Sequence, residues 1–476
     1  MMKKFLVALS FLCSFMLTSY GKQDNKLIVY DAPKGALLND DFIVKVKNPG
    51  ENWKDAPSHL VKVDEVRNTK HQVENASMAF FDFSGEVEVS ITYTKGNIDR
   101  ARIRPLSYGI EPKVEGNTLT FKLQEAANLS VEVNDDIFHN LHLFANPLMA
   151  DVPDKEKKDV IYFGPGIHTF EDDKFEVPSN STVYVDGGAI LRGQLLVHNV
   201  NNVKIIGSGM VEHTIKMGIH IAGSENVHVE GLFVTQCATG GSDNVTIRNL
   251  KSISYYGWGD GLNVFASSNV HYDRVFCRNS DDCTTVYATR KGFEGDARNI
   301  TMENSTLWAD VAHPIFIGIH GNADRPDTIE NLVYRNIDIL DHKEVQLDYQ
   351  GCLAINAGDN NVIRDVKFED IRIEDFRQGQ LFNVRIFFNE KYCPAPGQSI
   401  ENILFKDISY NGGGDEISII AGYNEERKIK NITFQNLKIN GRLITDDMPD
   451  KPKWYKTGDM ARIFIGEHVD NVQFIP

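Results

Sequence analysis

The chain has 476 residues, of which 50 are Lys or Arg and 66 are Asp or Glu, so its formal net charge is −16. Such a surface repels polyanions, which excludes nucleic acid as an expected partner and means that an anionic polysaccharide would need a local basic cleft. The six cysteines are scattered, without the spacing of a disulfide framework or a zinc site. We therefore expect buried thiols, with no metal ion and no cofactor.

The N-terminus has the pattern of a secretory signal. Two lysines precede an apolar run from Phe5 to Leu17, and Ser19 and Gly21 are small residues suited to cleavage after Gly21. The run is too short to span a bilayer, and no later stretch resembles a transmembrane helix. We expect a signal peptide over residues 1–21 and a secreted or periplasmic protein; lipidation at Cys13 is the membrane-anchored alternative.

Residues 22–150 are expected to form a β-sandwich. Short segments alternate apolar and polar residues with a period of two, and turn residues separate them, as is typical of antiparallel strands. The segments are 26–30, 42–46, 87–93, 118–123 and 129–133. A polar connection over 149–160, which contains Asp151 and Pro153, predicts a domain boundary near residue 150.

Residues 151–476 carry a repeat of Asn or Asp followed by Val, Ile or Leu. It begins at Asn202, Asn226, Asn244, Asn269, Asn299, Asn331, Asp365, Asn402, Asn431 and Asn471. The repeats contain short β-branched strands and no amphipathic helix, and they lack a leucine-rich consensus and the long blades of a propeller. The pattern favours a right-handed parallel β-helix, in which the repeated Asn stacks at a turn. The predicted fold class is therefore all-β, a sandwich followed by a solenoid.

Two acidic clusters lie about one solenoid coil apart. Asp260 stands in Gly-Asp-Gly, and Asp281-Asp282 follows 21 residues after Asp260. Solenoid coils bring equivalent positions into register, so these carboxylates should meet on one surface, with His313 one longer coil further on. Neighbouring carboxylates repel each other, which favours one protonated acid beside one ionised base. The constellation predicts acid/base hydrolysis.

These residues resemble the motifs of the polygalacturonase-like β-helix hydrolases, glycoside hydrolase families 28 and 49. Gly259-Asp260-Gly261, Asp281-Asp282-Cys283 and Ala312-His313-Pro314 stand where family 28 has Asn-Thr-Asp-Gly, Asp-Asp-Cys and Gly-His-Gly, and Gly318 also fits. The resemblance implies that Asp281 is the general acid, that Asp260 and Asp282 activate water for inverting attack, and that His313 tunes the acid and binds substrate.

One departure from the family bears on the substrate. Where the pectin-cleaving family has an Arg-Ile-Lys triplet suited to a uronate carboxylate, this chain has Ala354 and Asn356 at the basic positions. Family 49, the dextranase and isopullulanase group, is similar in placing a β-sandwich before the β-helix and acts on neutral α-glucans. The resemblance is therefore closest to family 49, and a dextran-like α-glucan is the favoured substrate.

Aromatic and basic residues flank the acidic clusters. Aromatic rings are platforms for sugar faces, so Trp258, Tyr256, Tyr287 and Trp308 are candidate substrate-binding residues, with Trp258 the first choice; stacking inside the solenoid is the alternative. Arg290 is a candidate for sugar hydroxyls, with a solvated loop as its alternative.

Other functions remain open for the whole chain. A galacturonide- or rhamnogalacturonan-type pectin hydrolase would use cations from other loops, such as Arg385. A polysaccharide lyase, and a non-catalytic carbohydrate-binding or adhesion protein on the same solenoid, are the remaining alternatives. In each case the expected partner is a polysaccharide or an oligosaccharide.

Overall fold

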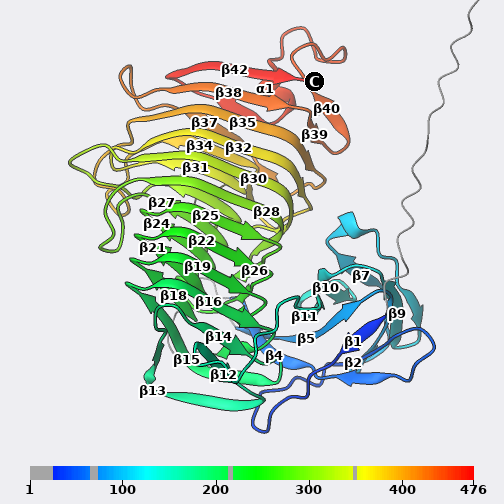
Figure 1. Cartoon of the computed structure of the whole chain (residues 1–476). Coiled ribbons are helices and arrows are strands. Elements are labelled where there is room, and N and C mark those ends of the chain that lie inside the picture. Colours follow the sequence, from blue (N-terminus) through cyan, green and yellow to red (C-terminus); the bar gives the residue numbers. More distant parts are fainter. Residues whose placement is uncertain (1–24, 65–72, 213–217, 347–350) are drawn as a thin grey trace, which may run out of the picture.

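The computed structural model describes residues 25–64, 73–212, 218–346 and 351–476. The predicted signal peptide, 1–21, and its cleavage site lie outside these residues. Within them nearly every element is a strand, and the strands form a small two-sheet body beside a long solenoid (Figure 1). No helix in the described ranges is long and apolar enough to cross a membrane.

The first part of the chain is a β-sandwich, as predicted. One sheet has the order β1-β5-β11-β10-β7, with β4 beside β5, and the other has the order β3-β2-β6-β9-β8. Its elements are β1 (Lys26–Ile28), β2 (Phe42–Lys47), β3 (Lys54–Ala56), β4 (His59–Val63), β5 (Glu74–Ser84), β6 (Val87–Tyr93), β7 (Ala101–Arg104), η1 (Leu106–Tyr108), β8 (Lys113–Glu115), β9 (Thr118–Leu123), β10 (Ala127–Val133) and β11 (Asp136–Pro147). Inward-facing side chains of both sheets, such as Val44, Val89 and Leu129, form one core. The pairing is antiparallel except between β5 and β11, which run parallel.

From Val160 onward, a single 29-stranded sheet winds into a right-handed β-helix. Its strands pair almost entirely in parallel. Its coils have three faces. Face 1 comprises β18 (Ile219–Ala222), β21 (Cys237–Gly240), β24 (Leu262–Phe265), β27 (Thr284–Tyr287), β29 (Ile315–Gly318), β31 (Leu353–Ala357), β34 (Phe382–Ile386), β37 (Ser418–Ala421) and β41 (Ile463–Ile465).

Face 2 comprises β12 (Val160–Phe163), β14 (Thr182–Val185), β16 (Asn201–Gly207), β19 (Glu225–Glu230), β22 (Asp243–Arg248), β25 (Ser268–Asp273), the first parts of β28 (Ala297–Ala309), β30 (Thr328–Asp341), β32 (Val362–Ile373) and β35 (Ser399–Tyr410), then β38 (Ile429–Gln435) and β42 (Val469–Ile475). Face 3 comprises β17 (Met210–Glu212), β20 (Phe233–Val234), β23 (Lys251–Ile253), β26 (Phe276–Asn279), the later parts of β28 to β35, and β39 (Leu437–Ile439). Strands β13 (Gly166–Glu176) and β15 (Ala189–His198) bend between faces, and β33 (Gly379–Gln380), β36 (Asp415–Glu416), β40 (Arg442–Ile444) and α1 (Thr457–Met460) complete the chain.

The repeated asparagines form a ladder at the start of face 2, which confirms the predicted role of the repeat. The side chain of Asn299, for example, donates from Nδ2 to Asn269 Oδ1 at 2.9 Å and accepts from Asn331 Nδ2 at 2.7 Å. Each of these three residues has a φ between 55° and 58°, a left-handed conformation that Asn tolerates better than most residues. The repeat therefore combines a turn with a hydrogen bond to the next coil.

The interior of the β-helix holds stacked apolar side chains, and all five cysteines of the described ranges are buried and unpaired, as expected. The rings of Phe368 and Phe405 stack 4.9 Å apart, and those of Phe434 and Phe474 stack 4.8 Å apart, one coil after another. These distances match the separation of neighbouring strands. Each coil therefore advances by about 4.8 Å along the axis.

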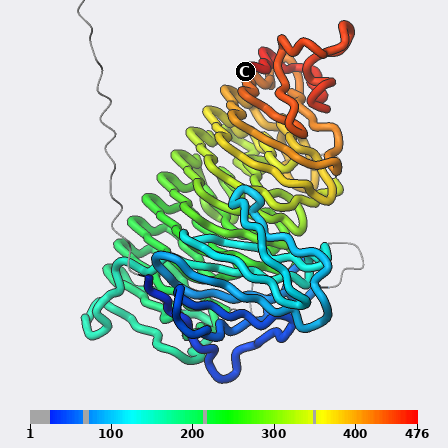
Figure 2. The backbone as a smooth tube through the Cα atoms, turned by 90° about the vertical axis from the view of Figure 1, so that its right-hand side faces the viewer, coloured from blue at the N-terminus to red at the C-terminus, as the bar shows by residue number. Residues whose placement is uncertain are grey.

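The sandwich lies across the side of the β-helix (Figure 2), where it contacts face 3 from the early coils to Glu374, directly after β32. Phe144 of β11 packs with Phe233 and Phe276 at ring distances of 5.4 and 5.1 Å. Strand β11 ends at Pro147 and β12 begins at Val160, so the predicted domain boundary at residue 150 lies between them. The division into two domains stays a prediction. The contact leaves face 1 uncovered by the sandwich.

Candidate active site

Three of the four predicted catalytic residues occupy equivalent positions on successive coils. Strand register pairs Leu262 with Thr284 and Thr284 with Ile315, and Asp260, Asp282 and His313 each stand two residues before these strand residues. The backbone continues the register, since Gly261 N–H donates to Asp282 O and Cys283 N–H donates to His313 O, both at 2.8 Å. The sequence spacing thus becomes a short stack at one edge of face 1.

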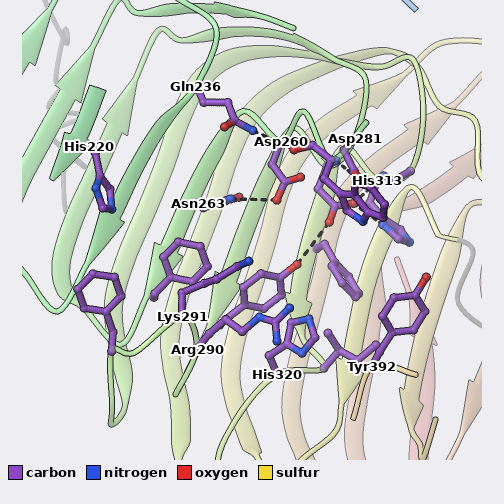
Figure 3. A pocket seen from close by; sticks show the side chains of 18 residues that line it. His220, Gln236, Asp260, Asn263, Asp281, Arg290, Lys291, His313, His320 and Tyr392 are labelled. Carbon is purple, nitrogen blue, oxygen red and sulfur yellow. Dashed lines mark hydrogen bonds and ion pairs between the residues drawn. The ribbon is translucent and has the colours of Figure 1, made fainter. Parts of the chain in front are cut away.

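The stack opens into a cleft of about 660 Å³, which also contains Asp281 (Figure 3). The floor comes from outward-facing side chains of face 1, and loops at both strand ends form the walls. The lining residues are His220, Gln236, Trp258, Asp260, Asn263, Phe265, Asp281, Asp282, Tyr287, Arg290, Lys291, Phe293, Ala312, His313, Phe316, Ile319, His320 and Tyr392. Carboxylates gather on one wall and cations on the other.

Asp282 is held tightly by the histidine on the next coil. Its Oδ1 accepts the His313 backbone N–H at 3.1 Å and lies 2.6 Å from His313 Nδ1, while the Tyr287 hydroxyl donates to Oδ2 at 3.4 Å. His313 is fully buried and stacks on Phe316 at 4.4 Å between ring centroids. Burial, followed by the nearby charge of Asp282, raises the pKa of Tyr287 well above its usual range. Several donors therefore converge on one carboxylate.

The other two carboxylates have different surroundings. Asp281 is 4% exposed, and its Oδ1 accepts the backbone N–H of Asp282 at 3.1 Å. Asp260 is half-buried, and its Oδ2 accepts from Asn263 Nδ2 at 2.9 Å; the side-chain Oδ1 of Asn263 in turn accepts from Thr285 Oγ1 at 2.7 Å. Asn263 was missed in the sequence analysis, although its place three residues after Asp260 was visible.

The cleft is lined by backbone in an unusual conformation. Trp258, Lys291, Ala312 and Ile319 have φ values of 57°, 54°, 65° and 60°. Side chains other than Asn and Asp rarely adopt this region, and a β-branched residue there is a true outlier. Such strain concentrates where the surrounding structure must hold functional groups in place. Ala312 directly precedes His313, so its turn sets the direction of the histidine.

A buried ion pair supports the acidic stack from behind. Arg278 stands three residues before Asp281, and Asp310 stands three residues before His313. The side chains of Arg278 and Asp310 are both fully buried and form an ion pair at 2.9 Å. Arg278 also donates to Asn140 Oδ1 and to Ile137 O of β11, each at 2.9 Å. The β-sandwich thus contacts the coil that presents Asp281 and Asp282.

The structure separates the predicted substrate-binding residues. Trp258, 64% exposed, lies in the cleft wall, and Tyr287 and Arg290 also line the cleft. Tyr256 is not among the lining residues, and burial raises its pKa above the usual range. The prediction that Trp308 is a sugar platform is wrong. Its side chain is fully buried on face 3, with the Arg278 guanidinium 4.0 Å from its ring.

Two further histidines that line the cleft, His220 and His320, were not predicted. Burial, with a contribution from Arg290, lowers the pKa of His320 to about 3. Burial and the neighbouring His198 lower the pKa of His220 to about 4, and the two rings are joined by a 2.9 Å hydrogen bond. His220 and His320 are therefore neutral near neutral pH. His220 was missed because it is 40 residues from Asp260 in the sequence.

The residues that replace the basic triplet lie one coil beyond His313. Register pairs Phe316 with Ala354 and Gly318 with Asn356, and both Ala354 and Asn356 are fully buried. Cations instead enter the cleft from the loop after β27, at Arg290 and Lys291. Among the residues that the structure describes, no group of three or more His, Cys, Asp or Glu is arranged to hold a metal ion.

The fold and cleft define a sandwich-bearing parallel β-helix protein with an acidic cluster on face 1. The model of glycosyl hydrolases family 28 matches residues 180–451, more than half of the sequence. The chain belongs to this family, which confirms the resemblance stated from its motifs.

Relatives and solved structures agree with this assignment. A probable endo-xylogalacturonan hydrolase A from Aspergillus fumigatus is 23% identical over 43% of this chain and 52% of its own length. A probable endopolygalacturonase D from Neosartorya fischeri is 20% identical over 61% and 59%. The chain thus spans a little over half the length of these relatives.

Dex49A from Penicillium minioluteum has the same fold, with a TM-score of 0.60 and 12% identity over 94% of this chain and 96% of Dex49A. A family 28 exopolygalacturonase from Yersinia enterocolitica reaches a TM-score of 0.51 with 12% identity over 81% and 96%. These two likenesses support the fold of both parts of the chain.

Proposed function

We propose that this protein is an inverting glycoside hydrolase that cleaves an α-linked polysaccharide. The stack of Asp260, Asp282 and His313 beside Asp281 in one cleft is the observation that carries the proposal. Membership of family 28 supports it. The N-terminal signal pattern supports secretion, so that the enzyme would meet its substrate outside the cytoplasm.

The chemistry divides between the carboxylates. Asp281 donates its proton to the glycosidic oxygen as the bond to the anomeric carbon breaks. Asp260 and Asp282 orient a water molecule on the opposite side of the sugar and accept its proton as the new C–O bond forms, which inverts the anomeric centre. The N–H groups of His313 stabilise the negative charge of Asp282.

A chain that contains uronic acid is the substrate class favoured here. Arg290 and Lys291 line the wall opposite the carboxylates, where a guanidinium and an ammonium can bind a sugar carboxylate. The family and the names of the curated relatives, a xylogalacturonan hydrolase and a polygalacturonase, point the same way. These cations would take over the task of the missing basic triplet.

A dextran-like α-glucan is the second candidate. Ala354 and Asn356 leave no cation on the coil after His313, as suits a neutral sugar. The sequence favoured this substrate, whereas Arg290 and Lys291 of the opposite loop support a uronate.

The test is hydrolysis of a panel of polygalacturonate, xylogalacturonan and dextran, with the anomer of the first product followed by proton NMR. We expect the fastest release of reducing ends from a galacturonate chain and a β-anomer as the first product. Arg290→Gln should slow hydrolysis of the galacturonate chain more than hydrolysis of any neutral glucan. Fastest cleavage of dextran, unaffected by Arg290→Gln, would favour the second candidate, and an α-anomer would refute inversion.

A further inference from the structure

The floor of the cleft stops one coil beyond the Asp281-Asp282 pair. Phe265 of β24, Tyr287 of β27 and Phe316 of β29 face outward and line the cleft. The next outward-facing positions along face 1, Ala354 and Asn356 of β31, do not line it and are fully buried. Another segment of the chain therefore covers face 1 at β31.

The cover is the loop that follows β34. Phe387 and Cys393 of this loop are buried and belong to the same apolar cluster as Phe316 and Ala354. The backbone N–H of Phe387 donates to Ala357 O at 3.0 Å, which anchors the loop to β31. The loop is thus packed onto the helix as a fixed part of the fold.

Tyr392 of the same loop forms the end wall of the cleft. Its hydroxyl donates to Gln346 Oε1 at 3.4 Å. Gln346 precedes β31, on the edge of face 1 that carries the carboxylates, whereas Tyr392 follows β34, on the opposite edge. The hydrogen bond therefore crosses face 1 from one edge to the other.

The two arms of the cleft differ in length. Figure 3 shows His220 and Tyr392 at opposite ends, with Asp281 and His313 nearer to Tyr392. From the coil of β27, three coils lead to β18, which carries His220, whereas the cover begins at β31, two coils away. At about 4.8 Å per coil, the short arm extends for only about 10 Å. Such an arm holds a short end of a sugar chain and blocks its continuation.

We propose that the protein acts at chain ends: the terminal sugars lie between the carboxylates and the Tyr392–Gln346 wall, and the remaining chain leaves past His220. This inference rests on the proposed hydrolase function. It predicts short products from the first turnovers and a polymer that shortens gradually.

The experiment compares viscosity loss with release of reducing ends on the best polysaccharide of the panel, and identifies the early products by chromatography. We expect viscosity to fall slowly for each bond cleaved and mono- or disaccharides to be the first products. A steep fall in viscosity, with a ladder of oligosaccharides from the start, would overturn chain-end action while leaving hydrolysis intact. No release of reducing ends from any polysaccharide or oligosaccharide would refute the proposed function itself, and this inference with it.

Opening the wall gives an independent result on the same protein. The double variant Tyr392→Ala with Gln346→Ala should release longer early products and lower the viscosity more for each bond cleaved. Phe388→Ala is the matched control, since Phe388 is 42% exposed on the same loop and does not line the cleft. If the double variant folds and keeps the product pattern of the control, the two residues are not the end wall.

Discussion

Asp282 and His313, 31 residues apart in sequence, are joined twice at one carboxylate oxygen. The backbone N–H of His313 donates to Asp282 Oδ1 at 3.1 Å, and its ring Nδ1 lies 2.6 Å from the same atom. Both contacts depend on the turn at Ala312, whose φ is 65°. The histidine is therefore a positioning residue for Asp282 as well as a lining residue of the cleft.

Removal of the His313 ring should slow catalysis. His313→Ala is expected to lower kcat by ~10²–10³-fold, because Asp282 loses a donor that orients it for proton transfer. His313→Asn supplies an amide N–H near the position of Nδ1 and should recover part of the loss. Steady-state kinetics with a pH profile of kcat/KM measure the effect. His271→Ala is the control, because His271 forms a solvent-facing pair with Glu303. Equal kcat for all three variants would show that His313 does not contribute to catalysis.

The Arg278–Asp310 pair should matter for stability and catalysis together. Loss of one partner from a buried ion pair costs about 3–5 kcal/mol, because the remaining charge is left uncompensated. We expect Arg278→Ala to lower the urea midpoint of unfolding clearly and to lower kcat more than it changes KM, since Asp281 follows three residues later. Arg248→Ala, which breaks a half-exposed pair with Asp273, should have little effect. Similar midpoints for the two variants would show that the buried pair does not support the stack.

Acid should destabilise the protein through His342. Burial, with the nearby His313, lowers the pKa of His342 from its usual 6.5 to about 3. Between these values the unfolded chain binds a proton that the folded protein does not, so the free energy of unfolding falls as the pH falls from 6.5 toward 3.

The variant His342→Gln should therefore lose less stability than the wild type between pH 7 and pH 4.5, although its stability at pH 7 is lower. Thermal unfolding at several pH values measures the slopes. Parallel slopes for the two proteins would mean that His342 does not contribute to the acid sensitivity.

The asparagine ladder should tolerate Gly better than Ala. Asn299→Ala loses two side-chain hydrogen bonds. It also puts Ala, which tolerates the left-handed region less well than Asn, at a φ of 57°, a conformation that costs about 1–2 kcal/mol. Asn299→Gly loses the same hydrogen bonds but relieves the backbone strain. We expect the Gly variant to unfold at a higher urea concentration than the Ala variant. The reverse order would contradict the conformational explanation.

The features that depend on periodicity could be predicted from the sequence. The features that depend on contacts between distant segments could not. The Asn repeat has one structural reason in every coil, so it identified the β-helix and placed Asp260, Asp282 and His313 in register. Trp308 was misassigned because alternation does not reveal which face of a coil packs against the sandwich. Tyr392 was missed because its place depends on a loop that folds back over β31 from a later coil.

The most direct test of the account is the rate of glycosidic hydrolysis by Asp281→Asn, measured together with binding of the same substrate. The amide keeps the size of the side chain and cannot donate the acid proton, so we predict a loss of kcat of at least ~10²-fold with binding nearly unchanged. Asp324→Asn, on an exposed loop, should behave as the wild type. Wild-type hydrolysis by Asp281→Asn would contradict the central claim that this cleft carries the catalytic acid.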